Sequence, residues 1–119
     1  TASVTAAQVC WGDVENGGIC PAGKTWDNLH IIGNARAFVA VDRDANDAFC
    51  WGTARFGGGC PEGKSWSHVQ IFGTWRAFVA VDTGANEAFC WGDSTAGGEC
   101  PTGKTWTNVE IYRGGQAFV

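Results

Sequence analysis

Six cysteines are the residues of this sequence whose chemistry is easiest to specify. They form three pairs with nine intervening residues in each, and the pairs recur every 40 positions: Cys10 and Cys20, Cys50 and Cys60, Cys90 and Cys100. An even number and a regular spacing predict disulfides, which persist in oxidising compartments. A bridge within each pair would close over a Gly-Gly turn and stabilise the fold by about 3 kcal/mol. A second pairing stays open, in which Cys20 joins Cys50 and Cys60 joins Cys90 or Cys100.

The sequence offers weak candidates for a metal site, and we expect neither a metal nor a cofactor. Zinc sites typically use cysteines two to four residues apart, and the two histidines, His30 and His68, do not recur in phase. The run Asp42–Asp47 resembles the start of a calcium loop, D-x-D-x-N, but lacks the glycine at position six and the glutamate at position twelve. We expect a solvated hairpin turn there, with weak calcium binding as the alternative.

A nucleotide-binding string also occurs in each copy. Residues 18–25, 58–65 and 98–105 match G-x4-G-K-[ST]. Such a loop binds phosphate through backbone N–H groups at the start of a helix. Here a proline removes one N–H group, a cysteine of the expected disulfide lies inside the loop, and a strand rather than a helix is expected to follow. We therefore interpret the segment as a turn, with the Lys24 stem lying over Trp26 or Trp11.

Seven tryptophans have two interpretations. Aromatic faces can stack on sugar rings, and aspartates beside the W-G motif could add hydrogen bonds, although Thr53 interrupts that series. The alternative, which we favour, is that the repeated indoles form a core layer. Trp75 stands outside the repeated pattern and is expected to be exposed. The candidate ligand-binding aromatics are Trp11, Trp26, Trp51, Trp66, Trp75, Trp91 and Trp106.

The remaining composition narrows the function classes. The 119 residues suit one domain, and their net charge of −4 argues against a basic nucleic-acid binder. No apolar run is long enough for membrane insertion, and no N-x-[ST] sequon occurs, although O-linked sugars stay possible. No Ser/His/Asp or Cys/His arrangement is suggested, so we do not expect an enzyme.

The chemistry-bearing residues belong to three copies of one unit. The copies cover residues 10–49 and 50–89, and residues 90–119 together with 1–9. A fixed period of this length is typical of repeat architectures, in which each unit packs on its neighbours. Residues 1–9 resemble the other copies poorly, as an N-terminal cap would. Val119 aligns with Val39 inside an expected strand, so we expect residues 1–9 or a neighbouring copy to complete that strand.

Each unit is expected to form a three- or four-stranded meander. Glycine and proline interrupt the chain every 10 to 15 residues, which favours short strands over helices. We predict strands over 29–32, 36–42 and 48–52 and over their equivalents, including 69–72 and 109–112. Residues 42–47 should form a hairpin turn in which Asn46 suits a positive φ. A short fourth strand is expected around Cys20. The expected core aromatics are Phe38, Phe49, Trp11, Trp26 and their equivalents.

This order of motifs resembles the repeat of the regulator-of-chromosome-condensation family. V-x-I is followed by A-F-V-A-V-D, a polar turn, F-C-W-G and a glycine pair. The resemblance implies β-propeller blades, and nothing of that family's nucleotide-exchange activity. This unit is shorter than is usual for the family, and the cysteine pairs and the C-P-x-G-K-x-W segment are additions. The residues that carry the resemblance are Val69, Ile71, Ala77 to Asp82, Phe89, Trp91, Gly92 and Gly97.

These observations predict an all-β protein with one tandem-repeat domain over residues 1–119. The three meanders are expected to be propeller-like or to stack as an array. The alternatives are a β-trefoil-like closure and a chain that is a window on a longer repeat protein. The expected function is extracellular and structural: self-association with neighbouring copies into a fibre or surface layer. The alternative is a lectin-like module that binds carbohydrate or protein, with glycans as possible partners.

Overall fold

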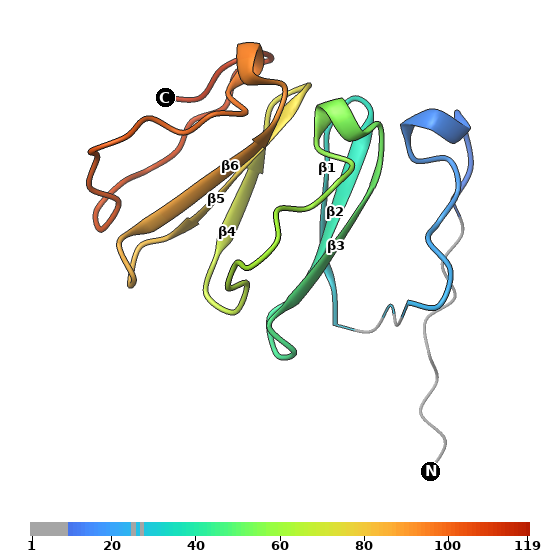
Figure 1. Ribbon diagram of the computed structural model, residues 1–119, viewed down its shortest axis with the longest axis horizontal. Helices are drawn as coiled ribbons and strands as arrows, with labels where there is room; N and C mark the ends of the chain where they lie inside the picture. Colours follow the sequence, from blue (N-terminus) through green and yellow to red (C-terminus); the bar gives the residue numbers. More distant parts are fainter. Residues whose placement is uncertain (1–9, 25, 27) are drawn as a thin grey trace.

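Short runs of β-branched and aromatic residues form the strands of this protein, as their pattern predicts. The computed structural model describes residues 10–24, 26 and 28–119 (Figure 1). One antiparallel sheet contains β1 (His30–Gly33), β2 (Ala37–Asp42) and β3 (Asp47–Gly52). A second contains β4 (Gln70–Gly73), β5 (Ala77–Asp82) and β6 (Glu87–Gly92). The prediction of an all-β fold is confirmed, and the strand bounds agree with the predicted ranges to within one residue.

Three short 3-10 turns complete the described elements. They are η1 (Val14–Asn16), η2 (Ala54–Phe56) and η3 (Ser94–Ala96), each ending at a left-handed glycine. All three lie at the edge of the molecule that also carries the β1–β2 and β4–β5 turns, opposite the tips of the β2–β3 and β5–β6 hairpins (Figure 1). Within the described residues, none of the helical segments is long and apolar enough to cross a membrane.

The two sheets have the same register. Val39 pairs with Cys50 in the first sheet, and Val79 pairs with Cys90 in the second. The predicted hairpin turn after β2 is confirmed, because Asn46 has a φ of 53° and its side chain faces the next loop. Asn86 occupies the equivalent place after β5 with a φ of 55°.

Two strand predictions are wrong. Residues 109–112 form no strand: pairing in this region consists of an isolated bridge between Arg113 and Phe118, two hydrogen bonds between Tyr112 and Val119, and one from the Gly114 N–H to the Ala117 carbonyl oxygen. The expected fourth strand around Cys20 is also missing, since that residue lies in irregular backbone. Its disulfide positions the segment there, so a ladder of hydrogen bonds is not needed to hold it.

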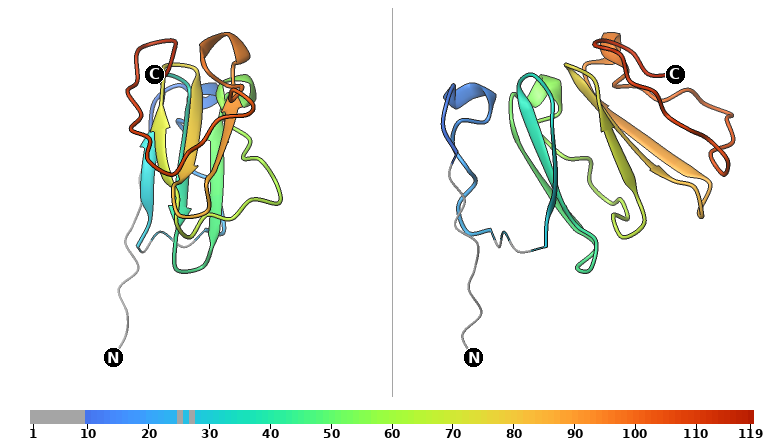
Figure 2. Two further views of the ribbon diagram at one scale, coloured as in Figure 1. Left: turned by 90° about the vertical axis from the view of Figure 1, so that its left-hand side faces the viewer. Right: turned by 180° about the vertical axis from the view of Figure 1, so that it is seen from behind.

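The core lies between the sheets, which stand side by side in an open arrangement (Figures 1 and 2). Side chains alternate between the two faces of each sheet. One face, the aliphatic face, meets the aromatic face of the next sheet in a single hydrophobic cluster. The aliphatic face of the first sheet contributes Ile32, Ala37, Val39, Val41, Ala48 and Cys50. The aromatic face of the second contributes Ile71, Phe78, Ala80, Phe89 and Trp91.

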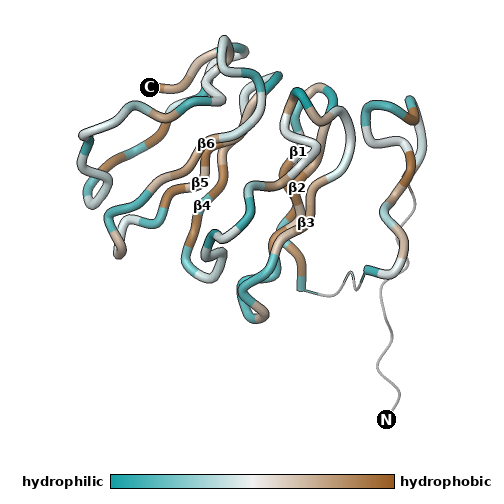
Figure 3. The backbone as a smooth tube through the Cα atoms, viewed as in Figure 1, coloured by the Kyte–Doolittle hydropathy of each residue, from teal (hydrophilic) through white to brown (hydrophobic). Residues whose placement is uncertain are grey.

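The segment that connects β3 to β4 fills the space between the sheets at their edges. It carries buried Phe56, Trp66 and Val69, and Cys60 packs against the same cluster. Hydropathy follows this plan: the strands are brown in Figure 3, and the hairpin tips are teal. The core is therefore shared between adjacent sheets rather than enclosed within one.

Candidate functional site

The feature that sets the first sheet apart is its uncovered aromatic face. Ile31, Phe38 and Trp51 lie on this face, and Trp11 and Trp26 reach it from the preceding segment. Together with the turn at residues 16–18 they line an open groove of about 450 Å³. In the second sheet, the equivalent face is buried against its neighbour.

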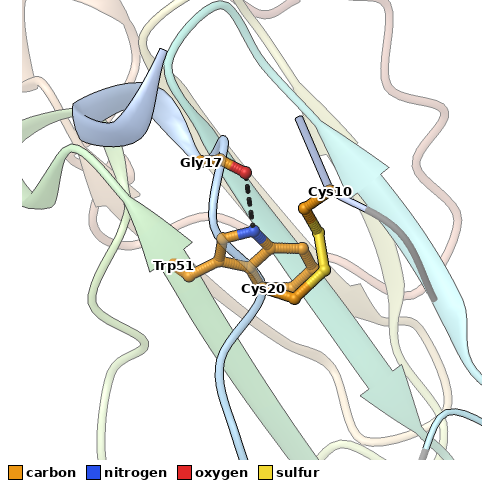
Figure 4. Close-up of a disulfide and its surroundings, with 4 residues drawn as sticks. All are labelled: Cys10, Gly17, Cys20 and Trp51. Atoms are coloured by element: carbon orange, nitrogen blue, oxygen red, sulfur yellow. Dashed lines mark hydrogen bonds between the residues drawn. A yellow bond between two sulfur atoms is a disulfide. The ribbon is translucent and has the colours of Figure 1, made fainter. Parts of the chain in front are cut away.

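An aromatic cluster forms the floor of the groove. Trp51 stacks on Phe38 with their ring centroids 5.2 Å apart, and Trp26 meets Trp51 edge-on at 5.5 Å. The Trp51 Nε1–H group donates a hydrogen bond to the Gly17 carbonyl oxygen at 3.3 Å, close to the disulfide between Cys10 and Cys20 (Figure 4). These contacts hold the indole at a fixed angle. Offset-stacked and edge-to-face pairs are the arrangements that aromatic rings prefer.

The second sheet contains an equivalent aromatic cluster with similar distances between the rings. Trp91 stacks on Phe78 at 5.3 Å, Trp66 meets Trp91 edge-on at 5.7 Å, and Trp91 Nε1 donates to the Gly57 carbonyl oxygen at 3.2 Å. The two aromatic faces differ in how far they are exposed to solvent. Ile71 is 6% exposed, whereas Ile31, its equivalent in the first sheet, is 41% exposed.

The first glycine of the pair after each W-G motif is explained by the phenylalanine beneath it, and the second by the W-G backbone, since a Cβ atom on Gly58 would lie 2.5 Å from the Gly52 carbonyl oxygen. Gly57 has a φ of +103°, and a Cβ atom there would lie 2.6 Å from the Phe78 ring. The same close approach joins Gly17 to Phe38. A larger residue would lift the turn off the ring, so glycine is required by sterics as well as by the backbone angle.

All three disulfides join the two cysteines within a pair: Cys10 to Cys20, Cys50 to Cys60 and Cys90 to Cys100. Their Cα atoms are 5.3–5.4 Å apart, the usual separation for such bridges. The alternative pairing between units is not formed. The bridges from Cys50 in β3 and Cys90 in β6 fix the segment after each sheet to the sheet itself.

The structure places the seven candidate tryptophans in three environments. Trp66 and Trp91 are buried, and Trp26, Trp51 and Trp106 are half-buried. Trp75 is 63% exposed, as predicted. Trp11 is 82% exposed, so its prediction as a core residue is wrong. Its equivalents, Trp51 and Trp91, are held against a phenylalanine by strand pairing, and within the described residues Trp11 belongs to no strand.

The lysine of the nucleotide-like string covers an aromatic ring, but not the predicted one. Lys24 Nζ lies 5.1 Å from the centroid of Phe49, and Lys64 Nζ lies 5.4 Å from that of Phe89. The expected contact with Trp26 or Trp11 is therefore corrected to Phe49. A cation over a ring face is a stabilising contact in its own right.

In the calcium-like run at residues 42–47, side-chain oxygens of Asp42 and Asn46 accept hydrogen bonds from backbone N–H groups. Asp42 Oδ1 accepts the backbone N–H of Ala45 at 3.1 Å, and Asn46 Oδ1 accepts the backbone N–H of Trp66 at 2.6 Å. Within the described residues, no group of three His, Cys, Asp or Glu side chains is placed to hold a metal ion.

The aspartates beside the W-G motif act as helix caps. Asp93 Oδ1 accepts hydrogen bonds from the Thr95 hydroxyl at 2.6 Å and from the Thr95 N–H at 2.9 Å, and Asp13 accepts the N–H of Glu15. The hydrogen bonds from Thr95, helped by Arg55 and Arg76, hold the pKa of Asp93 below its ordinary value. Sequence reasoning considered these aspartates for sugar binding and missed the cap, although Asp is a favoured residue at that position.

Comparisons with known proteins add no assignment. No protein-family model matches the chain, and a search of curated proteins found no significant match. The resemblance to the regulator-of-chromosome-condensation repeat stays a prediction from the motifs.

Proposed function

We propose that this protein is an extracellular structural repeat protein whose sheets stack face to face into an extended array, a fibre or surface layer, by self-association of neighbouring copies. The proposal is based on a difference in burial between the equivalent faces of the two sheets. The aromatic face of the second sheet, which includes Ile71, is buried, whereas the aromatic face of the first sheet, which includes Ile31, is open.

The contact between the sheets is of a kind that can propagate. An aliphatic face meets an aromatic face, so the two surfaces in contact are different from each other. A head-to-tail interface of this type generates a ring if its rotation closes and a filament if it does not. The two separate, open sheets support a stacked or propeller-like arrangement over the trefoil-like alternative, in which the strands would share one barrel.

Complementary surfaces are exposed at opposite ends of the stack. At one end lies the groove around Ile31, Phe38 and Trp51. At the other, Tyr112 is 64% exposed, whereas its equivalent Ile32 packs against the cluster between the sheets. We take a second copy of this chain as the occupant, because such a copy would continue an interface that already exists between the sheets. Burying apolar area in this way is worth roughly 25 cal/mol per Å².

The disulfides support the proposed location. Three bridges in a chain of this size indicate an oxidising, extracellular type of environment. In a layer or fibre in that environment, the bridges would keep the connecting segments attached to their sheets when the backbone hydrogen bonds there open transiently.

Assembly is tested on the oxidised chain by light scattering coupled to gel filtration and by negative-stain electron microscopy. The variant Ile31→Glu places a charge in the open groove, and Ala45→Glu adds the same charge at an exposed hairpin tip as a control. We expect the native chain and Ala45→Glu to form linear particles that grow with concentration, and Ile31→Glu to stay monomeric. A native chain that is monomeric at every concentration, or an Ile31→Glu variant that assembles normally, would refute the proposal.

Glycan binding is the second candidate function. A sugar site on every repeat gains no support at Trp66 and Trp91, because their indoles are buried. Trp75 is different, since it is exposed and lies beside Arg76, and this place in the fold leads to the inference below.

A further inference from the structure

Consecutive turns lie in a row along the edge that carries η1, η2 and η3 (Figure 1). The Ala35 N–H donates to the Trp75 carbonyl oxygen at 3.0 Å, and the Trp75 N–H donates to the Gly115 carbonyl oxygen at 2.7 Å. Hydrogen bonds of this kind place neighbouring chains about 5 Å apart, as in a sheet. The turns at residues 34–36, 74–76 and 114–116 therefore form one continuous, hydrogen-bonded ridge.

Arginines gather along this ridge although the protein is acidic as a whole. Arg36 and Arg76 belong to the turns themselves, Arg55 lies in η2, and the Arg113 guanidinium donates to the Gly73 carbonyl oxygen at 3.3 Å. The edge with η1 and η3 also carries Asp13, Glu15 and Asp93, and Arg43 lies at the opposite edge. The hairpin tips of that opposite edge carry a larger group of acidic residues. These are Asp42, Asp44, Asp47, Asp82 and Glu87.

Two of the ridge arginines are held in place by one buried ring. The guanidinium carbons of Arg36 and Arg76 lie 4.9 Å and 5.3 Å from the centroid of Phe56. Arg76 is 3.9 Å from Asp93, and within the described residues Arg36 and Arg113 have no carboxylate within 4 Å. Arg36 and Arg76 are thus held at the same ring, Arg76 with a carboxylate nearby and Arg36 without one.

Trp75 supplies a flat apolar surface on the same ridge. Its indole is 63% exposed, and its inner side lies against Gly115, 3.5 Å from the position of a Cβ atom there. Both backbone polar groups of Trp75 are hydrogen-bonded, so the turn that presents the ring is held on both sides.

We propose that this ridge binds an acidic polysaccharide, with a sugar ring stacked on Trp75 and carboxylate or sulfate groups held by Arg36, Arg76 and Arg113. Guanidinium groups bind such anions through paired N–H donors, which favours arginine over lysine in this role. A closely spaced row of cations suits a polymer with acidic groups at regular intervals. The inference goes beyond self-association and uses a different surface from the groove at Ile31.

Binding is measured by calorimetry on the full oxidised chain with three saccharides: a sulfated heparin fragment, polygalacturonate and neutral dextran. A single-stranded polyuridine tests nucleic acid. We expect one or both acidic saccharides to bind in a salt-dependent manner, and dextran and polyuridine to bind far more weakly. The comparison of heparin with polygalacturonate identifies sulfate or carboxylate as the preferred group.

Variants locate the site. Arg36→Gln and Trp75→Ala are each expected to weaken acidic saccharide binding by about tenfold, the scale of a charge-assisted contact. Lys64→Gln and Lys104→Gln remove exposed cations elsewhere, and should bind normally. Circular dichroism confirms that each variant is folded.

Three results would overturn the inference: no acidic saccharide binds, binding is unchanged in both ridge variants, or polyuridine binds as tightly as the saccharides. The Ile31→Glu variant separates this inference from the proposed assembly. It should retain saccharide binding even though it does not stack, and a loss of assembly alone leaves the ridge intact.

Discussion

The repeated architecture allows one substitution to be compared at two equivalent positions, Ile71 and Ile31. Isoleucine to alanine removes three carbon groups, each worth about 0.8 kcal/mol when fully buried. Ile71 is 6% exposed and Ile31 is 41% exposed. Scaled by the buried fraction, the transfer cost is about 2.3 kcal/mol for Ile71→Ala and about 1.4 kcal/mol for Ile31→Ala.

A cavity adds to the cost at only one of the two positions. Ile71 belongs to the cluster between the sheets, so its removal leaves a void lined by side chains from both. Such a void brings the expected total for Ile71→Ala to about 3–4 kcal/mol. Ile31 faces an open groove, where water can fill the space. The expected difference between the variants is therefore about 2 kcal/mol.

Urea unfolding of the oxidised chain, followed by far-ultraviolet circular dichroism, measures this difference. Dilute protein reports on the separate chain. At high protein concentration a stacked neighbour would cover Ile31, and the cost of Ile31→Ala should then rise toward that of Ile71→Ala. The cost of Ile71→Ala itself should not change with concentration.

Equal costs for the two variants in dilute solution would refute the reasoning, because they would mean that the two aromatic faces are equally covered in the single chain. A cost of Ile31→Ala that stays constant while particles form would show that assembly uses another surface.

Three further predictions follow from single residues. Gly57→Ala should destabilise the protein by about 2 kcal/mol or more, because of its positive φ and the ring beneath it, whereas Gly59→Ala, with open space around it, should change the urea midpoint little. Asn46→Gly keeps the positive φ but loses the acceptor for the Trp66 N–H, and should cost about 1 kcal/mol in the same assay. Because the pKa of Asp93 is lowered by folding, its contribution to stability is present above the unfolded pKa and is lost as the pH falls through the folded value. Thr95→Val removes the hydroxyl donor, so a carboxyl titration by nuclear magnetic resonance should show the pKa of Asp93 moving upward; an unchanged pKa would contradict that assignment.

Local signals explain which parts of the fold could be predicted from the sequence. The β2–β3 hairpin follows from an alternating apolar run, a polar turn and an asparagine suited to positive φ, all within about 16 residues. The pairing of Cys50 with Cys60 likewise depends on a short segment closed by a turn. Each of these features is decided by residues that are near one another in the chain.

The wrong predictions concern contacts between segments that are distant in sequence. Trp11 lies between a cysteine and a glycine as Trp51 does, but Trp51 is half-buried by its pairing with Phe38 across the sheet. Residues 109–112 have a strand-like sequence, yet only the bridge at Arg113 and Phe118 forms. An alternating pattern shows that a segment suits a strand, but not whether partners are present on both sides of it.

In the proposed assembly, stacks grow because the two faces of each sheet differ. The unit contains two different faces, one aromatic and one aliphatic, and a twofold contact would pair one of them with a copy of itself. Ile31 and Tyr112 are exposed at opposite ends, so in the proposed assembly each copy would cover what the next one leaves open. A twofold dimer would cover only one kind of face and leave the other open. Head-to-tail stacking covers both, and it is the arrangement that the sheets within the chain already use.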